Sequence, residues 1–599
     1  MSIHYTVAST APESHFFDVM ITVPEIPDRE IELVLPVWIP GSYMVRDYAR
    51  HVMTVEAVDR TGQPVTVSRS GKSRWRVQTG IGETKVSLVI YGWDLSVRGA
   101  HIDRSHAYFN GACLLPEVKG HAGPFRLTVL PPEGLPESAV VATSMRPDQV
   151  DAKGFGDYMA ADYDELLDHP FEIADQQCIA FEAAAVPHRF FIRGTGGFDE
   201  ARFRVDCQKI CEAHHALLGT PTELDRYDFL SYALDKGYGG LEHRWSSSLA
   251  LSRDALPQAG QLTDERAYRT LLGLISHEYF HLWNVKRLKP AAFVPMDMSQ
   301  EVHTTLLWVF EGVTSYYDDL ILARSGVVSE EVYLQLLAEN LTRILRTPGR
   351  FRQTLADSSF DAWTKFYKQD ENAPNAIISY YAKGALAALA LDLKLRAETE
   401  TTLDAVMREC WQRFYLTDGA GIPEDGFERV ASELADRDLS SFFDHAIRST
   451  SDIDVAELFK PFGIQVQLHC AADSSDTGGI DHKHRRQVDS GIRFDPGNSS
   501  RIRSVIAGSA AADAGLSAGD QVVALNGRKA GRKQFDLLMQ SAGPGDTMAV
   551  HAFRRDLLAE YSLTLRSADA DTAVIRIDPD ASDDAIARRR AWLALGPGD

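Results

Sequence analysis

The 599-residue sequence predicts a multidomain protein of the α+β class, and three changes of pattern along the chain support this. Apolar and polar positions alternate in the first part of the chain, as in half-buried strands. Strand and helix signals mix in the next part, and helical spacing dominates the part after it. A polar stretch then precedes a compact strand-rich segment. We expect an N-terminal antiparallel β domain at 1–165, a mixed domain at 166–325, an α-helical domain at 326–470, a linker at 471–489, a C-terminal β-rich domain at 490–567 and a charged tail at 568–599.

Short alternating runs predict the strands of the N-terminal domain. In each run every second residue is apolar, which is the period of a strand with one buried face. Proline and glycine stand between the runs and favour turns there. The clearest runs are Val19/Ile21/Val23, Ile31/Leu33/Leu35, Val86/Leu88/Ile90 and Phe125/Leu127/Val129.

Two strands and a long helix are expected in the mixed domain. Residues 227–234 and 248–251 have strand character and flank a glycine-rich turn at 237–240. Thr263 and Asp264 are good helix N-caps, and the helix that they begin should continue until Pro290 stops it.

The following domain has clear helix signals. Ser329 can cap a helix whose leucines share one face, and Pro348 with Gly349 should end it. A second helix is expected from Lys383 to Arg396.

Composition excludes several classes of protein. The formal net charge is −22, which argues against a nucleic-acid partner because such binding needs a basic face. No apolar run approaches the ~18 residues of a membrane span, and the first residues lack a signal-peptide pattern. The six cysteines include no Cys-x-x-Cys pair, so we expect a reducing, cytoplasmic location. Cys207 and Cys211 lie one helical turn apart and are either two metal thiolates or small buried hydrophobic residues.

The segment 276–283 carries a metal-binding pattern. His277 and His281 are four residues apart, so on a helix they project from one face and can bind one Zn²⁺. Glu278 lies beside the open position of such a metal, where its carboxylate can accept a proton from water. The alternative is two histidines on an amphipathic helix that binds no metal.

A catalytic zinc needs a third protein ligand, and Glu311 is the best candidate. It lies in a mostly apolar segment, 308–317, where a carboxylate is costly unless it binds a cation. Asp318 and Asp319 are competing candidates that could instead orient the histidines or face water. A helix-surface position for Glu311 is the remaining alternative.

Together these segments resemble the glycyl aminopeptidase family of gluzincin metallopeptidases, distant relatives of thermolysin. The resemblance covers essentially the whole chain and implies a thermolysin-like catalytic domain with one Zn²⁺ per chain. It is carried by the sequences at 38–50, 109–112, 277–287 and 308–320.

The resemblance also implies substrate-binding and catalytic residues. Glu242 matches the glutamate that holds the free α-ammonium group of a peptide in related aminopeptidases, although the neighbouring His243 departs from their pattern. Gly239 and Gly240 would let the peptide lie along this edge strand. Tyr381 matches a tyrosine that donates to the oxyanion, and Tyr380 is its most easily confused neighbour. Ordinary structural roles remain alternatives for each.

The C-terminal β-rich domain resembles bacterial PDZ domains. A short helix at 510–514 and a hairpin turn at Asn526-Gly527 are the clearest features. A PDZ domain captures a peptide carboxyl terminus at a turn, and here the matching loop contains Gly491, Ile492, Arg493 and Phe494. A purely structural packing module is the alternative.

The expected function is zinc-dependent hydrolysis of N-terminal residues, glycine or alanine by resemblance, from peptides with a free amino terminus. One rival is an endopeptidase in which Glu242 is structural. The other is a catalytically silent peptide-binding scaffold that works through the PDZ-like domain.

Overall fold

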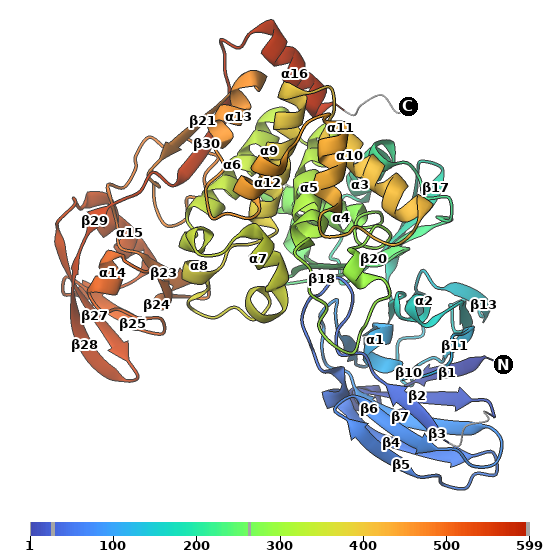
Figure 1. The fold of residues 1–599 in the computed structure, drawn as a ribbon. Coiled ribbons are helices and arrows are strands. Elements are labelled where there is room, and N and C mark those ends of the chain that lie inside the picture. Colours follow the sequence, from blue (N-terminus) through green and yellow to red (C-terminus); the bar gives the residue numbers. More distant parts are fainter. Residues whose placement is uncertain (1, 26–29, 261–264, 595–599) are drawn as a thin grey trace. The chain divides into compact units, whose positions relative to one another are not determined.

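The computed structural model describes residues 2–25, 30–260 and 265–594 (Figure 1). The chain divides into two compact units. The first contains residues 1–302 and 418–421, and the second contains 303–417 and 422–599. The expected helix caps Thr263 and Asp264 lie outside the described residues.

The first unit begins with a β-rich domain whose largest sheet has seven strands in the order β13-β14-β11-β1-β2-β7-β4. Its outer strands are β13 (Arg146–Val150) and β14 (Gly156–Ala160) at one side and β4 (Val52–Asp59) at the other. The four predicted runs are confirmed as β2 (Phe16–Val23), β3 (Glu30–Val34), β7 (Thr84–Tyr91) and β11 (Phe125–Val129). Most neighbours pair antiparallel, but β1 (Ile3–Ala8) pairs with β11 in parallel. The expectation of a wholly antiparallel domain is therefore wrong at this one pair.

A second sheet of this domain has four strands in the order β12-β15-β9-β8. Its central strands are β15 (Phe171–Ala174) and β9 (His106–Phe109), and β8 (Ala100–Ile102) forms an edge. The strand β12 (Val140–Ala142) forms the other edge.

The mixed domain has a five-stranded sheet in the order β16-β17-β18-β20-β19, which begins with β16 (Gln177–Ala183) and β17 (Val186–Arg193). The predicted strands are confirmed as β18 (Tyr227–Leu234) and β20 (Ser246–Ser252). Most of the expected glycine-rich turn instead belongs to the edge strand β19 (Tyr238–Glu242), which pairs antiparallel with β20.

Two helices accompany this sheet, α3 (Glu200–Leu218) and α4 (Glu265–Phe280). The expectation that α4 continues to Pro290 is wrong, because the backbone tightens after Phe280. There the amides of Leu282 and Trp283 donate to carbonyl groups only three residues earlier, and Val285 has a positive φ of 91°, which a right-handed helix cannot contain.

The second unit begins with a π-helical turn at Trp308–Gly312 that leads into α5 (Val313–Arg324). Both predicted helices are confirmed, as α6 (Glu330–Leu345) and α9 (Ala382–Glu398). The hydroxyl of Ser329 accepts a hydrogen bond from the amide of Val332, which caps α6 as expected.

The described residues of the expected charged tail, 568–594, are folded. They contain β30 (Thr572–Ile577), which pairs with β21 (Ile464–His469), and α16 (Asp583–Leu593). In Figure 1 β21 and β30 lie side by side. The side chain of Trp592 in α16 is fully buried. A charged composition misled the prediction because α16 buries only a few of its residues.

The segment between β21 and β30 contains the C-terminal strand-rich unit. Its main sheet has the path β23-β24-β25-β27-β28. These strands are β23 (Ile492–Asp495), β24 (Asn498–Val505), β25 (Gln521–Leu525), β27 (Thr547–Arg554) and β28 (Leu557–Thr564). The predicted short helix is α14 (Ala510–Asp513), and Asn526 and Gly527 form the hairpin turn with positive φ angles of 49° and 71°. The first and last strands of the segment, β22 (Val488–Asp489) and β29 (Arg566–Ser567), pair with each other.

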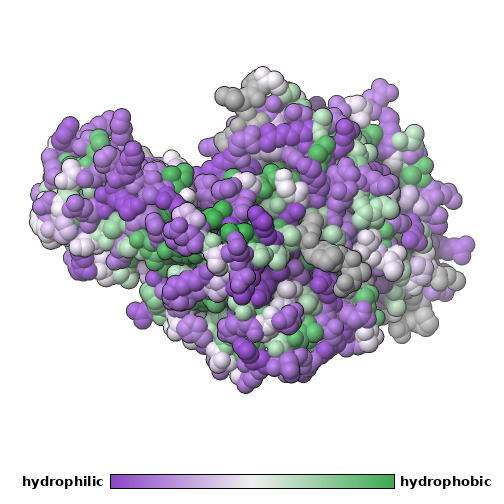
Figure 2. Space-filling view, turned by 90° about the horizontal axis from the view of Figure 1, so that it is seen from above, coloured by the Kyte–Doolittle hydropathy of each residue, from purple (hydrophilic) through white to green (hydrophobic). Residues whose placement is uncertain are grey.

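No helix in the described residues is long and apolar enough to cross a membrane. The face drawn in Figure 2 is mostly hydrophilic, with hydrophobic residues between the polar ones.

Candidate metal and peptide-binding site

The end of α4 brings two imidazoles and a carboxylate together. His277 and Glu278 lie in its last turn, and His281 is the first residue after it. The two imidazole rings stand at 85° with centroids 4.8 Å apart, and each offers a nitrogen within 4.8 Å of the other. Nδ1 of His281 donates to the carbonyl of Asn284 at 2.8 Å. This bond places the proton on Nδ1, so Nε2 is the nitrogen of His281 that could bind a metal.

Glu278 is a buried base. Its side chain is 5% exposed, and Oε2 has no hydrogen-bond partner among the described residues. Burial raises the pKa of Glu278 to about 7, an effect that His277 opposes and that Glu242 reinforces. A carboxyl group titrating near neutral pH suits general acid and base catalysis.

Gly240 allows the edge strand β19 to lie close to the carboxylate of Glu278. A Cβ atom on Gly240 would lie 2.0 Å from Oε1 of Glu278, so only glycine allows β19 to approach α4 this closely. Nη2 of Arg98 donates to the carbonyl of Gly240 at 2.8 Å, and a Cβ on Gly239 would lie 3.8 Å from the same guanidinium group. Arg98 was not predicted from the sequence, which shows no motif around it.

Glu242, the last residue of β19, carries a second buried carboxylate. It is 3% exposed, and its Oε1 has no hydrogen-bond partner in the described part of the chain. A Cβ on Gly41 would lie 2.3 Å from that oxygen, and Gly41 has a positive φ of 89°. The loop at 38–50, singled out in the sequence, therefore packs glycine directly against the carboxylate.

His243 has a structural environment. It is 1% exposed, and its Nδ1 lies 3.3 Å from Oδ1 of Asp168. The same carboxylate accepts hydrogen bonds from Nζ of Lys286 at 2.7 Å and from the amide of Arg244 at 2.8 Å. A cavity of about 320 Å³ adjoins these groups and is also lined by Gly41. Asp168 was missed because nothing in its sequence neighbourhood distinguishes it from a surface aspartate.

In the second unit, the π-helical turn holds Glu311, which is 2% exposed. A Cβ on the adjacent Gly312 would lie 2.6 Å from the Cα of Gly384 and 2.8 Å from the carbonyl oxygen of Tyr380. Two glycines thus allow the turn with Glu311 to pack against the start of α9. A surface position for Glu311 is excluded.

The two neighbouring tyrosines differ in exposure. Tyr380 is fully buried, whereas Tyr381 is half-buried, and the phenol oxygen of Tyr381 lies 3.0 Å from that of Tyr367. Asp318 and Asp319 are also half-buried. The greater exposure of Tyr381 makes it the better candidate for contact with a substrate.

The remaining candidate residues are the two cysteines of α3 and residues 491–494 of the C-terminal strand-rich unit. Cys207 and Cys211 are fully buried on α3, and burial raises the pKa of both thiols well above the usual value. The described metal-ligand groups include neither cysteine. Ile492, Arg493 and Phe494 lie in β23 (Ile492–Asp495), an edge strand of the C-terminal sheet, and Gly491 precedes it.

The chain is similar to known peptidases. A family model described as M61 glycyl aminopeptidase matches residues 270–387, and one for the M61 peptidase N-terminal domain matches residues 4–175. Among curated proteins, none matches this chain.

Two solved structures are also similar to this chain. An aminopeptidase N family protein from Idiomarina loihiensis is 36% identical, with a TM-score of 0.94 over 99% of this chain and 100% of that chain. An M1 zinc metallopeptidase from Deinococcus radiodurans is 15% identical, with a TM-score of 0.46 over 75% of this chain and 94% of that chain.

The matched residues include the end of α4, the π-helical turn and the start of α9, and the first structure above spans nearly the whole chain. The prediction of a metallopeptidase of the aminopeptidase type is confirmed at the level of the family. The chain belongs to the M61 family of glycyl aminopeptidases.

Proposed function

We propose that the protein is a zinc-dependent aminopeptidase whose Glu242 binds the α-ammonium group of a peptide. The supporting observation is the buried Oε1 of Glu242, which has no hydrogen-bond partner among the described residues. A buried carboxylate without a partner is costly, and a single cationic group would satisfy it. Gly41 keeps the space beside this carboxylate clear of side chains.

One Zn²⁺ per chain would be held by His277, His281 and Glu311. Two imidazoles and a carboxylate are a ligand set of catalytic zinc sites, which keep one further position open. The bond from His281 to the carbonyl of Asn284 and the unpartnered Oε2 of Glu278 both fit a cation at this place. Bound there, zinc would supply Lewis acidity toward water and the scissile carbonyl.

The protein groups would then move the proton and stabilise charge. Glu278 accepts a proton from the attacking water and returns it to the leaving amine. The phenol of Tyr381 donates a hydrogen bond to the oxyanion, an interaction that in other acyl-transfer sites contributes about 2.7–4 kcal/mol. A peptide lies along β19, with its amino terminus at Glu242 and its first carbonyl toward the metal.

The preferred N-terminal residue is small, glycine or alanine, as the description of the matching family suggests. The rival endopeptidase activity requires Glu242 to be structural, which its unpartnered oxygen disfavours. The silent-scaffold alternative is disfavoured by the buried, raised-pKa Glu278, because a scaffold has no use for such a base.

The C-terminal unit, 490–567, is proposed to be PDZ-like and to bind a peptide carboxyl terminus beside β23. The edge position of β23 suits an added strand, and Phe494 packs edge-to-face against Phe535 of the helix α15 (Arg532–Ser541). The candidate binding residues are Gly491, which precedes β23, and Ile492, Arg493 and Phe494 in β23.

The test compares Glu242→Gln with the wild type on free-amine and amino-blocked peptides. Hydrogen bonds to charged groups contribute ~1.5–3 kcal/mol, so kcat/KM on free-amine peptides should fall about ten- to a hundredfold. Blocked peptides, which lack the cation, should be poor substrates of the wild type and should not respond further. Zinc content should stay unchanged. Glu182→Gln, an exposed position in β16 (Gln177–Ala183) of the same sheet, is the matched control.

An equal loss on both peptides would show that Glu242 is structural. Efficient cleavage of blocked peptides by the wild type would favour the endopeptidase instead.

A further inference from the structure

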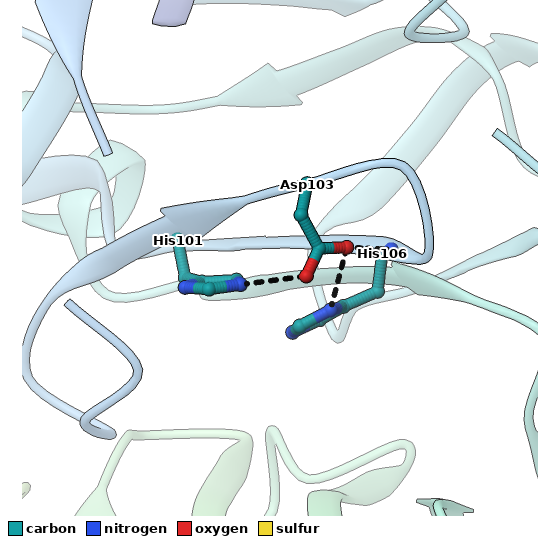
Figure 3. A group of neighbouring side chains, drawn as sticks. All are labelled: His101, Asp103 and His106. Atoms are coloured by element: carbon teal, nitrogen blue, oxygen red, sulfur yellow. Dashed lines mark hydrogen bonds and ion pairs between the residues drawn. The ribbon is translucent and has the colours of Figure 1, made fainter. Parts of the chain in front are cut away.

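A second group of candidate metal ligands lies on the β8–β9 hairpin, outside the site described above. His101, Asp103 and His106 form a His-x-Asp-x-x-His sequence that the sequence analysis did not single out. Figure 3 shows the three side chains gathered at one end of the hairpin. We propose that they bind a second divalent metal ion of the zinc class.

Two distances already match a zinc site. Nε2 of His101 lies 3.3 Å from Oδ2 of Asp103, and Nδ1 of His106 lies 3.6 Å from Oδ1 of the same carboxylate. With bonds of about 2.1 Å, two ligand atoms of a tetrahedral zinc ion lie about 3.4 Å apart. The three candidate atoms all lie within 4.8 Å of one another. An ion at this place would replace the contacts between the two imidazoles and Asp103.

The two imidazoles are buried but incompletely bonded. His101 is 4% exposed and His106 is 1% exposed. Nδ1 of His101 and Nε2 of His106 are buried and have no hydrogen-bond partner among the described residues. These two nitrogens lie on the ring sides opposite Asp103, so the candidate ligand atoms are Nε2 of His101 and Nδ1 of His106, which contact Asp103.

Strand register explains why the polar groups share one face. His101 pairs with Tyr108 across β8 and β9, and Tyr108 pairs with Glu172 across β9 and β15. His106 is two residues before Tyr108 in β9 and so faces the same side. The two imidazole rings are inclined by only 25° with centroids 4.6 Å apart, so binding requires them to turn toward a common point.

The donor atoms favour a borderline divalent cation. Two nitrogen donors and one carboxylate suit Zn²⁺ better than Ca²⁺ or Mg²⁺, which prefer oxygen ligands.

Metal can reach the site from the side of Asp103. This side chain is 29% exposed, so a fourth position beside it can hold water. On the other side, the indole of Trp93 stacks on His101 with centroids 4.5 Å apart. The hairpin also holds Asp103 in place, because its Oδ1 accepts from the amides of Ser105 and His106.

The experiment measures zinc per chain by elemental analysis after loading with zinc and desalting. We expect two ions in the wild type and one in His106→Ala and in Asp103→Asn, with peptidase activity retained in both variants. The control His121→Ala changes a half-buried histidine of the same domain outside the cluster and should keep two. Because this site is independent of the proposed catalytic zinc, His281→Ala should also keep one ion, and His106→Ala/His281→Ala none.

Two zinc ions per chain in folded Asp103→Asn would overturn the proposal. It would also be overturned if the wild type binds a single ion that is lost in His281→Ala and retained in Asp103→Asn. Asparagine keeps the side-chain oxygen that accepts from the hairpin amides, so Asp103→Asn decides the question if His106→Ala fails to fold by circular dichroism. A single wild-type ion lost in Asp103→Asn and retained in His281→Ala would instead support this site and contradict the catalytic one.

Discussion

At the scale of a single residue, the burial of Glu278 and its proposed role as a general base have opposing effects on its ionisation. Its burial raises the pKa to about 7, which weakens ionisation, yet a general base must be ionised to accept a proton. The neighbouring His277 acts in the opposite direction and lowers the pKa. A bound divalent cation would lower it further, so loading the site and activating the base are coupled.

Glu278→Gln should keep zinc and lose nearly all turnover, because glutamine keeps the shape but cannot accept the proton. General-base catalysis contributes about 10²–10⁴-fold, and kcat should fall by at least that factor. Kinetics and elemental analysis of the same sample check both parts. Glu212→Gln, an exposed position on α3, is the control. Normal turnover in the Glu278→Gln variant would rule out the role of Glu278 as the base.

The pH dependence of the wild type tests the same residue. Since only the ionised carboxylate accepts a proton, kcat/KM should rise with pH and reach half its maximum at or below about pH 7. The cation shifts this limb downward, toward the usual value of 4.5. Activity that grows as pH falls from about 7 to about 5 would contradict this assignment.

At the scale of elements, the loop that carries Gly41 and the strand β19 together form the surroundings of Glu242. The loop comes from the N-terminal domain and the strand from the mixed domain, and they meet at the carboxylate of Glu242. Arg98 joins the same strand through the carbonyl of Gly240. The proposed binding of the peptide amino terminus therefore depends on the N-terminal domain, which contributes none of the proposed ligands of the catalytic zinc.

Gly41→Ala tests this dependence. The positive φ of 89° disfavours any side chain, and the new Cβ would lie 2.3 Å from the Glu242 carboxylate. We expect a loss of about 1–3 kcal/mol in unfolding free energy from the strained backbone alone. We also expect kcat/KM on free-amine peptides to fall at least about tenfold, because the carboxylate must shift.

Gly62→Ala is the matched control, since Gly62 has a φ of 83° and no atom within 4 Å of an added Cβ. It should show a similar loss of stability, by urea unfolding, with unchanged kinetics. Identical kinetics in both variants would contradict the proposed link between the loop and Glu242.

Elements with a local signal were predicted well. The alternating residues of β2 and β7 have one buried face each, and the N-cap Ser329 with its leucine stripe is sufficient to define α6. The end of α4 was missed because a change from four-residue to three-residue hydrogen bonds has no residue signature. For the candidate site, the residues in the motif at 277–281 were recognised, but contacts such as Gly41 with Glu242 join segments too distant for sequence spacing to reveal.

At the scale of the whole molecule, the helical domain of the second unit is discontinuous along the chain, because another segment is inserted into it. The strand-rich segment 488–567 lies between two strands, β21 and β30, that pair residue by residue from Ile464 with Ile577 to His469 with Thr572. The segment after it completes the helical domain, since the carbonyl of Trp592 accepts hydrogen bonds from Arg324 of α5. The strand-rich segment is thus an insertion into the helical domain.

Two deletions should behave differently for this reason. Ending the chain after residue 567 removes β30 and α16, exposes the core that surrounds Trp592, and should yield an insoluble or strongly destabilised protein. Replacing residues 488–567 by a short glycine turn keeps both elements, because the amide of Ala568 already donates to the carbonyl of Gln487. That variant should stay folded, bind zinc and cleave short peptides.

Soluble yield, thermal unfolding, zinc content and kcat/KM on a tripeptide distinguish the two. A stable, active protein that ends at residue 567 would contradict the structural role of β30 and α16. A folded, zinc-loaded but inactive replacement variant would show that the inserted segment contributes to catalysis.

The pairing of β21 with β30 also constrains the order of events during synthesis. The helices of the second unit emerge from the ribosome long before β30 and α16 do. Their apolar faces therefore stay uncovered while the inserted segment is synthesised. The inserted segment has its own core and can fold during that interval. The helical domain closes only when β30 and Trp592 arrive, and its assembly is therefore late, non-local and slow.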